Sequence, residues 1–293
     1  MKQLFSVLMV MLVSAGFLLS CDSGTATKTA ERPVTVDSAG VTSQWKLGVQ
    51  MWTFHTYTFL TALEKVDSAG LRFIEAFQGQ PMGGDFNDTF GLSMRPESKT
   101  KIKTLLAQKG IRLLAMGVIS PGSVQEWKKN FEFAKEMGLE YITAEPRKEH
   151  LDTINSMAGK YGIFVAIHDH PNPSPYAHPD SVLNAIKGRI NIGACADLGH
   201  WARNGLDVVD CLKKLEGRIY GVHLKDIQKF NDVHAADTTL GNGVLRFPEI
   251  FAEFKRQNFK GLFSIEHELH WENNVPDVIY NRDYFTRQIG AVK

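Results

Sequence analysis

Short apolar runs alternate with longer stretches of helical period along most of this chain. The runs are four to nine residues long, the length of buried strands, and most are followed by a stretch in which apolar residues recur every three to four positions. The runs predict eight strands, at residues 46–52, 71–77, 111–119, 141–144, 162–167, 190–196, 219–222 and 262–265. Helices are predicted at residues 57–69, 96–109, 123–137, 180–187, 207–215 and 248–257, with a further helix starting near residue 147.

Eight such alternations predict a (β/α)8 TIM barrel, an α/β fold, as a single catalytic domain of residues 45–293. Adjacent parallel strands need crossover helices, and eight strands close the sheet. The main competitor is a doubly wound open sheet. A glycine-rich phosphate-binding fingerprint after the first strand would favour that fold. This fingerprint is missing, and Met51-Trp52-Thr53-Phe54-His55 stands there instead.

The first 44 residues are organised differently. Residues 1–20 have the layout of a signal peptide, and they close on Leu18-Leu19-Ser20-Cys21, which resembles the lipobox of bacterial lipoproteins. We expect a lipidated Cys21 followed by a flexible tether over residues 21–44, which is rich in small and polar residues. The expected location is a membrane-anchored lipoprotein in the periplasm or at the cell surface, in contact with the membrane through the lipid alone. Plain secretion is the alternative.

Charge and cysteine content narrow the class of protein. A formal net charge of +1 and the lack of a long basic run argue against nucleic acid as a partner. Cys195 lies in an apolar run and Cys211 in a helical pattern, so both are expected to be buried free thiols.

Candidate chemistry is concentrated where the later strands end. The segments Ile167-His168-Asp169-His170, Asp197-Leu198-Gly199-His200, His223-Leu224-Lys225-Asp226 and Glu266-His267-Glu268 each follow or end an apolar run. Strand ends of a barrel converge on one mouth, so we expect the following side chains to point at one centre: Glu145, His168, Asp197, His223 and Glu266. Mixed carboxylate and imidazole donors predict one divalent metal ion, Mn, Zn, Co, Fe or Mg, with Mn favoured.

The order of these segments resembles that of the sugar phosphate isomerase/epimerase superfamily. These xylose isomerase-like TIM barrels include ketose 3-epimerases, inosose dehydratase and endonuclease-type enzymes, and the resemblance runs from about Leu47 to the C-terminus. In the epimerases, a metal-binding Asp is followed three positions later by a substrate-contacting His and 26 positions later by a ligand His. Asp197, His200 and His223 have this spacing, and Glu266 matches the family's last ligand. The resemblance implies that Asp197, His223 and Glu266 bind the metal.

The chain departs from that family at the first ligand. Family members usually carry Glu-x-His at the end of strand five, where this chain has His168-Asp169-His170. A glutamate, Glu145, stands one strand earlier, so either Glu145 or His168 completes the ligand set, and the other is available as an acid or base. Lys225 is either an ion-pair partner of Asp226 or a group that polarises a substrate oxygen.

Two local strings favour elimination over epimerisation. Epimerases place an Arg six positions after the ligand His of strand seven, where Lys229 stands here. The His-rich end of strand five, together with His223-Leu224-Lys225-Asp226, is more similar to inosose dehydratase, which implies removal of a proton beside a ketone and loss of a β-substituent. A tethered protein outside the cytoplasm seldom meets sugar phosphates, so the expected substrate is a non-phosphorylated keto sugar or keto-glycoside.

The sequence therefore predicts metal-dependent enolisation of a keto sugar, with β-elimination on 3-keto-glycosides as the leading reaction. A partner sugar dehydrogenase is expected to supply the ketone. The expected catalytic residues are His168, His170, His200 and Lys225, with Glu145 and Glu266 as further candidate bases. Isomerisation or epimerisation of free sugars is the enzymatic alternative.

Two other classes remain open. A phosphodiesterase of the endonuclease type would need more metal ligands on strands two and three than this chain has. A non-catalytic sugar-binding lipoprotein would use the aromatic residues expected near the mouth, Trp52, Phe54, Phe86 and Phe90, as ring platforms.

Overall fold

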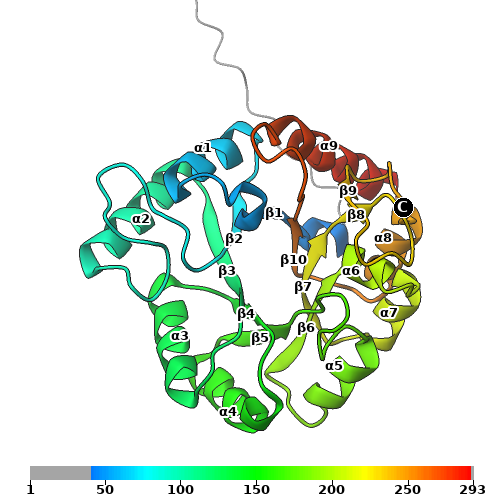
Figure 1. Ribbon diagram of the computed structural model, residues 1–293, viewed down its shortest axis with the longest axis horizontal. Helices are drawn as coiled ribbons and strands as arrows, with labels where there is room; N and C mark the ends of the chain where they lie inside the picture. Colours follow the sequence, from blue (N-terminus) through cyan, green and yellow to red (C-terminus); the bar gives the residue numbers. More distant parts are fainter. Residues whose placement is uncertain (1–40, 292–293) are drawn as a thin grey trace, which may run out of the picture. The chain divides into compact units, whose positions relative to one another are not determined.

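The computed structural model describes residues 41–291, and within this range eight parallel strands close into a barrel surrounded by helices (Figure 1). The order around the barrel is β1-β10-β7-β6-β5-β4-β3-β2. The barrel strands are β1 (Lys46–Gln50), β2 (Phe73–Ala76), β3 (Arg112–Ile119), β4 (Tyr141–Ala144), β5 (Phe164–Ile167), β6 (Ile192–Asp197), β7 (Ile219–Leu224) and β10 (Leu262–Ile265). The predicted TIM barrel is confirmed, and each predicted strand overlaps one of these.

Helices cross between successive strands and cover the outside of the barrel. They are α1 (Phe59–Ser68), α2 (Pro96–Lys109), α3 (Val124–Met137), α4 (Leu151–Tyr161), α5 (Pro179–Ile186), α6 (Leu198–Arg203), α7 (Val208–Lys214), α8 (Phe247–Arg256) and α9 (Val275–Ala291), with short 3-10 helices η1 (Val41–Gln44), η2 (Met51–Phe54) and η3 (Lys148–His150). Capping residues in the sequence explain where these helices begin and end. The Ser123 hydroxyl accepts the Glu126 N–H at the start of α3, and Gly110 ends α2 with φ of 62°.

Helices α6 and α9 and the two short strands β8 and β9 were not predicted from the sequence. Helix α6 has six residues and begins directly after β6, so it adds no separate helical period. Strands β8 (Asp226–Ile227) and β9 (Asp237–Thr238) have two residues each, too few to show an alternation. Helix α9 buries three residues along its length, Val278, Asn281 and Phe285, and such a narrow apolar stripe is a weak signal.

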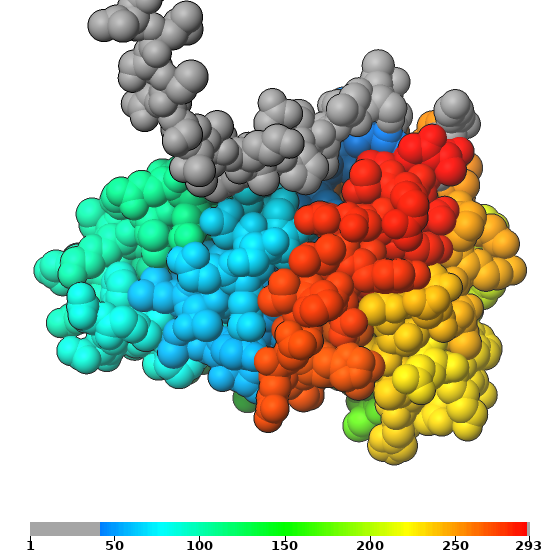
Figure 2. Space-filling model, turned by 90° about the horizontal axis from the view of Figure 1, so that it is seen from above, coloured from blue at the N-terminus to red at the C-terminus, as the bar shows by residue number. Residues whose placement is uncertain are grey.

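Helix α9, at the C-terminal end of the described chain, packs against the segment around α1, near its N-terminal end. The Arg282 guanidinium donates to the carbonyl of Ala69, just after α1, and α9 also packs on α8. Figure 2 shows the α9 segment, in red, beside the blue and cyan segments that contain α1. Phe285 of α9 also contacts Trp45, just before β1, and Phe263 in β10, and the pairing of these two strands closes the barrel.

Most of the predictions for the first 44 residues lie outside the described range. The signal peptide of residues 1–20, the lipidated Cys21 and the tether up to residue 40 stay predictions, while Val41–Gln44 form η1. Among residues 41–291, no helix has the length and apolar character needed to cross a membrane. Cys195 and Cys211 are buried free thiols, as predicted.

Candidate active site

Four side chains meet at the carboxyl ends of neighbouring barrel strands. They are His168 after β5, Asp197 at the end of β6, His223 in β7 and Glu266 after β10. Asp197 lies directly opposite His223 in the β6–β7 register, and β7 in turn pairs with β10. All four side chains are buried, and one ligand atom from each lies within 4.8 Å of the others. We call these residues the four-donor cluster.

The facing atoms of the four-donor cluster lack hydrogen-bond partners. These atoms are both ring nitrogens of His168, Asp197 Oδ2, His223 Nδ1 and Glu266 Oε2. Asp197 Oδ2 lies 3.7 Å from His168 Nε2 and 3.8 Å from His223 Nδ1, which is 3.0 Å from Glu266 Oε2. Each buried polar atom left without a partner costs about 1–3 kcal/mol. Two imidazoles and two carboxylates around one point are a suitable donor set for a divalent metal ion.

Glu75 orients the imidazole of His223. Its Oε2 lies 3.1 Å from His223 Nε2, and its carboxylate also accepts hydrogen bonds from Thr143 and Ser264. A carboxylate can only accept, so Nε2 carries the proton and Nδ1 faces the four-donor cluster with its lone pair when the ring is neutral. Burial opposes the charge on Glu75, but His223 and these hydrogen bonds lower the pKa of Glu75.

Lys225 lies buried beside the same carboxylates. Its Nζ is 3.4 Å from Asp197 Oδ2, 3.3 Å from Glu266 Oε2 and 2.5 Å from Glu268 Oε1. Burial would lower the pKa of Lys225, but these carboxylates raise it well above its ordinary value, so the side chain is an ammonium ion. The prediction of an ion pair between Lys225 and Asp226 is wrong. The Asp226 carboxylate instead accepts hydrogen bonds from four backbone N–H groups.

Glu145 is turned away from the four-donor cluster towards His170. Its Oε1 lies 2.8 Å from His170 Nδ1 and accepts hydrogen bonds from the His170 N–H and the Ser174 hydroxyl. Its distance to His168 Nδ1 is 4.0 Å. Burial would raise the pKa of Glu145, but the nearby His168 imidazole and the hydrogen bonds from His170 lower it far below the usual range. Of the two candidates for the fourth donor, the geometry groups His168 with the cluster.

His200 lies at the edge of the four-donor cluster in a fixed tautomer. Arg203 approaches His200 Nδ1 at 3.0 Å, and a guanidinium can only donate, so the ring proton resides on Nε2. Burial lowers the pKa of His200 well below its ordinary value, although Asp197 acts in the opposite direction. His200 is therefore a neutral imidazole. Its Nε2 lies 3.5 Å from Asp197 Oδ2 and can donate a hydrogen bond.

A cavity of about 630 Å³ opens above these residues. Its lining includes Glu266, His200, His170 and Glu268 from the site, together with Trp52. The volume lies in the range of small-molecule binding pockets. The cavity thus connects the four-donor cluster to residues that can contact an organic ligand.

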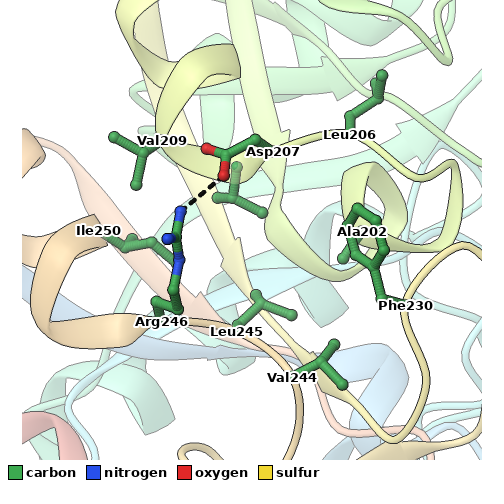
Figure 3. Close-up of a pocket in the computed structure, with 10 residues that line it drawn as sticks. Ala202, Leu206, Asp207, Val209, Phe230, Val244, Leu245, Arg246 and Ile250 are labelled. Carbon is green, nitrogen blue, oxygen red and sulfur yellow. Dashed lines mark hydrogen bonds and ion pairs between the residues drawn. The ribbon is translucent and has the colours of Figure 1, made fainter.

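A second, smaller pocket of about 170 Å³ lies elsewhere, between α6, α7 and the start of α8 (Figure 3). Its lining is mostly apolar, and an ion pair between Asp207 and Arg246, 2.6 Å apart, crosses it. It contains no residue of the four-donor cluster. The two charged residues of its lining, Asp207 and Arg246, are thus paired with each other.

The sequence did not indicate the partners of three acidic residues. Glu75 and Glu268 are 148 and 43 positions from His223 and Lys225, so no local spacing links them. Asp169 accepts the Asp197 N–H at 2.8 Å, and burial followed by repulsion from Asp197 raises the pKa of Asp169 well above its usual value. Its position between His168 and His170 was the available signal. Of the aromatic residues expected to act as ring platforms, Phe90 is buried against Phe59, whereas Trp52 lines the cavity.

A model of the xylose isomerase-like TIM barrel family matches residues 63–285 of the chain. The chain belongs to the xylose isomerase-like TIM barrel family. This confirms the family expected from the strand-end motifs. Among solved structures, an uncharacterized protein from Parabacteroides distasonis is 36% identical, with a TM-score of 0.69 over 83% of this chain and 99% of that chain.

Other proteins to which the chain is similar are more distant. The structure of the IolI protein with a bound zinc atom is 17% identical and shares the fold with a TM-score of 0.70, over 85% of this chain and 99% of that chain. An inosose dehydratase of Mesomycoplasma hyopneumoniae is 33% identical over 87 residues, which are 25% of this chain and 29% of that protein. The chain spans less than half the length of the curated relatives it matches.

Proposed function

We propose that this protein is a metal-dependent lyase that acts on 3-keto-glycosides by β-elimination. The observation that carries the proposal is the four-donor cluster with its unpartnered atoms, because Glu266 of the cluster lines a cavity that also contains His170 and His200. Inosose dehydratases among the relatives support chemistry beside a ketone on a sugar-like ring. His168, Asp197, His223 and Glu266 would hold one divalent ion. When bound, such an ion withdraws electrons from a carbonyl and makes the neighbouring C–H more acidic.

His170 is the proposed base. Its Nδ1 is engaged by Glu145, so Nε2 is the nitrogen available to take the proton from C2 of the sugar. Glu145 orients the ring and stabilises the imidazolium that forms. As the C2–H bond breaks, its electron pair becomes the C1–C2 double bond while the C1–O bond breaks. The His170 proton then passes to the departing oxygen, which balances the reaction to an unsaturated keto sugar and a free alcohol or phenol.

His200 and Lys225 have supporting roles in this proposal. The Nε2–H of neutral His200 donates to a substrate oxygen, because its other nitrogen is held by Arg203. Lys225 keeps the carboxylates of Asp197 and Glu266 in position by contacting both. Lys229, which stands where epimerases carry Arg, is 72% exposed, pairs with Asp232 and is not part of the cavity lining.

Product analysis tests the function. Purified protein would be incubated with an aryl 3-keto-glucoside in ²H₂O, with Mn²⁺ or with a chelator, and the products followed by mass spectrometry and NMR. We expect metal-dependent release of the phenol and an unsaturated keto sugar, and loss of this activity in Glu266→Gln. The exposed variant Glu97→Gln should match wild type. Deuterium incorporation at C2 without phenol release would identify an epimerase and sink the lyase proposal.

A further inference from the structure

The cavity lining is part polar and part apolar. The polar groups with capacity for a ligand include Glu266, His200, His170 and Glu268, together with the exposed His234. Three other polar lining residues already have partners in the protein: Gln50 donates to the Gly117 carbonyl and accepts the Trp52 N–H, Gln78 donates to Asn130, and Arg203 donates to Ala235 and Asp237. A sugar hydroxyl placed far from the cluster would therefore find few hydrogen-bond partners.

Trp52 forms a rigid platform in the cavity lining. It follows β1 in η2 and is 40% exposed although it lines the cavity. His55 stacks on it with ring centroids 4.6 Å apart and an interplanar angle of 15°, and Phe77 meets it edge-on at 5.0 Å. Trp271 in turn contacts His55 edge-on at 4.3 Å. Since His55 covers one face of the indole, the accessible surface of Trp52 lies on its other face and edge.

The rest of the cavity lining includes several apolar residues. Val118 lies in β3, Pro171 follows His170 after β5, and Val233 and Ala235 lie in the loop between β8 and β9. Val233 is itself an exposed apolar side chain. An exposed aromatic ring in a cavity that also contains these aliphatic residues suits a flat apolar ring.

We propose that Trp52, supported by His55 and Phe77, binds the aromatic aglycone of the glycoside while the sugar ring lies beside the four-donor cluster. The inference rests on the proposed function, since it assumes that the cavity receives a glycoside. It makes Trp52 a residue that determines specificity for the leaving group. An aryl oxygen is also a better leaving group than an alkyl oxygen, so the platform would favour substrates that eliminate readily.

Binding of unreactive glycosides tests this subsite separately from catalysis. Phenyl and methyl β-glucosides, which carry no ketone, would be titrated calorimetrically into the metal-loaded protein. We expect phenyl glucoside to bind more tightly, and Trp52→Ala to weaken its binding by about three- to tenfold while leaving methyl glucoside unchanged. The matched control is Phe230→Ala, since Phe230 is an exposed aromatic that lines the second pocket.

The outcomes separate the two proposals. Equal weakening of both glucosides by Trp52→Ala would place the sugar ring on the platform and overturn the inference. Tighter binding of cellobiose than of phenyl glucoside would do the same, because it would identify a second sugar as the occupant. Failure of wild type to bind phenyl glucoside more tightly also overturns it. Binding as expected, with no phenol released from the keto-glycoside, would keep the aglycone subsite and reject only the lyase reaction.

Discussion

At the residue scale, three histidines of the site each have one nitrogen engaged by a neighbour. Glu75 engages His223, Glu145 engages His170 and Arg203 engages His200. The partner determines which nitrogen carries the proton and which is left for a metal or a substrate. The same type of side chain can therefore serve as ligand, base or donor within one cavity.

Replacing Glu75 should weaken metal binding even though all four residues of the four-donor cluster are kept. In Glu75→Gln the amide can donate to His223 Nε2, which favours the tautomer with the proton on Nδ1, the atom that faces the cluster. We expect metal affinity to fall about 10- to 100-fold. Competition with a chromophoric chelator measures it, with exposed Glu97→Gln as control. Unchanged affinity would show that Glu75 does not orient this ligand.

Replacing Glu145 distinguishes an orienting residue from a metal ligand. Glu145→Gln keeps the side-chain size but removes the charge beside His170 Nδ1. We expect kcat to fall about 10²- to 10⁴-fold, because Glu145 orients His170 and a general base usually contributes that much to the rate. Metal affinity should be preserved. The measurements are steady-state kinetics and metal content on the same preparation. A parallel loss of bound metal would instead assign Glu145 to the ligand set.

At the residue scale, the sequence indicated most of the residues of the site but not the hydrogen-bond partners of those residues. Asp197, His223 and Glu266 were predicted to converge because each terminates or follows a strand of one barrel. The choice between Glu145 and His168 stayed open, because it depends on the direction in which each side chain leaves its strand end. Hydrogen bonds from His170 and Ser174 turn Glu145 aside, and neither bond follows from a motif.

At the element scale, the barrel strands approach one another closely at glycines. In β1, a Cβ added to Gly48 would lie 2.5 Å from the carbonyl oxygen of Phe73 in β2. Backbone atoms of a barrel cannot move aside as the end of a flexible side chain can. The strand that leads into Trp52 and η2 therefore requires a glycine at this position.

Gly48→Ala should destabilise the protein. Forcing a methyl group against the β2 backbone is expected to cost about 1–3 kcal/mol, as in other overpacked cores. Urea unfolding followed by circular dichroism would measure the free energy of unfolding. The control is Gly290→Ala in α9, where an added Cβ meets no atom within 4 Å. Equal stability of the two variants would contradict the close approach of β1 and β2.

At the scale of the whole molecule, the four-donor cluster joins the ends of four neighbouring strands. Several atoms of its buried carboxylates and imidazoles have no hydrogen-bond partner within the protein. Burial would raise the pKa of Glu266, but Lys225 and His223 lower it to about 2, so this carboxylate is ionised at neutral pH. A bound divalent ion would thus stabilise the native barrel.

Thermal unfolding should therefore depend on metal. Saturation at about 100 times the dissociation constant stabilises the native state by about 2.7 kcal/mol. For a protein of this size that corresponds to a rise in Tm of about 5–10 °C. Scanning calorimetry of chelator-treated and Mn²⁺-loaded protein would measure the shift, and His223→Ala should abolish it. A wild-type Tm that does not respond to Mn²⁺, Zn²⁺ or Co²⁺ would contradict the metal site.

The sequence by itself determined the barrel and the strand ends that carry its chemistry, because the alternation of buried strands and amphipathic helices is a local pattern. The extra elements α6, α9 and the β8–β9 pair were too short or too weakly apolar to show such a pattern. Only the tertiary structure decided which donors face one another, which tautomer each histidine adopts and which aromatic residue lines the cavity. These properties depend on contacts between residues far apart in the chain, such as Glu75 with His223, and a linear pattern contains no record of such distances.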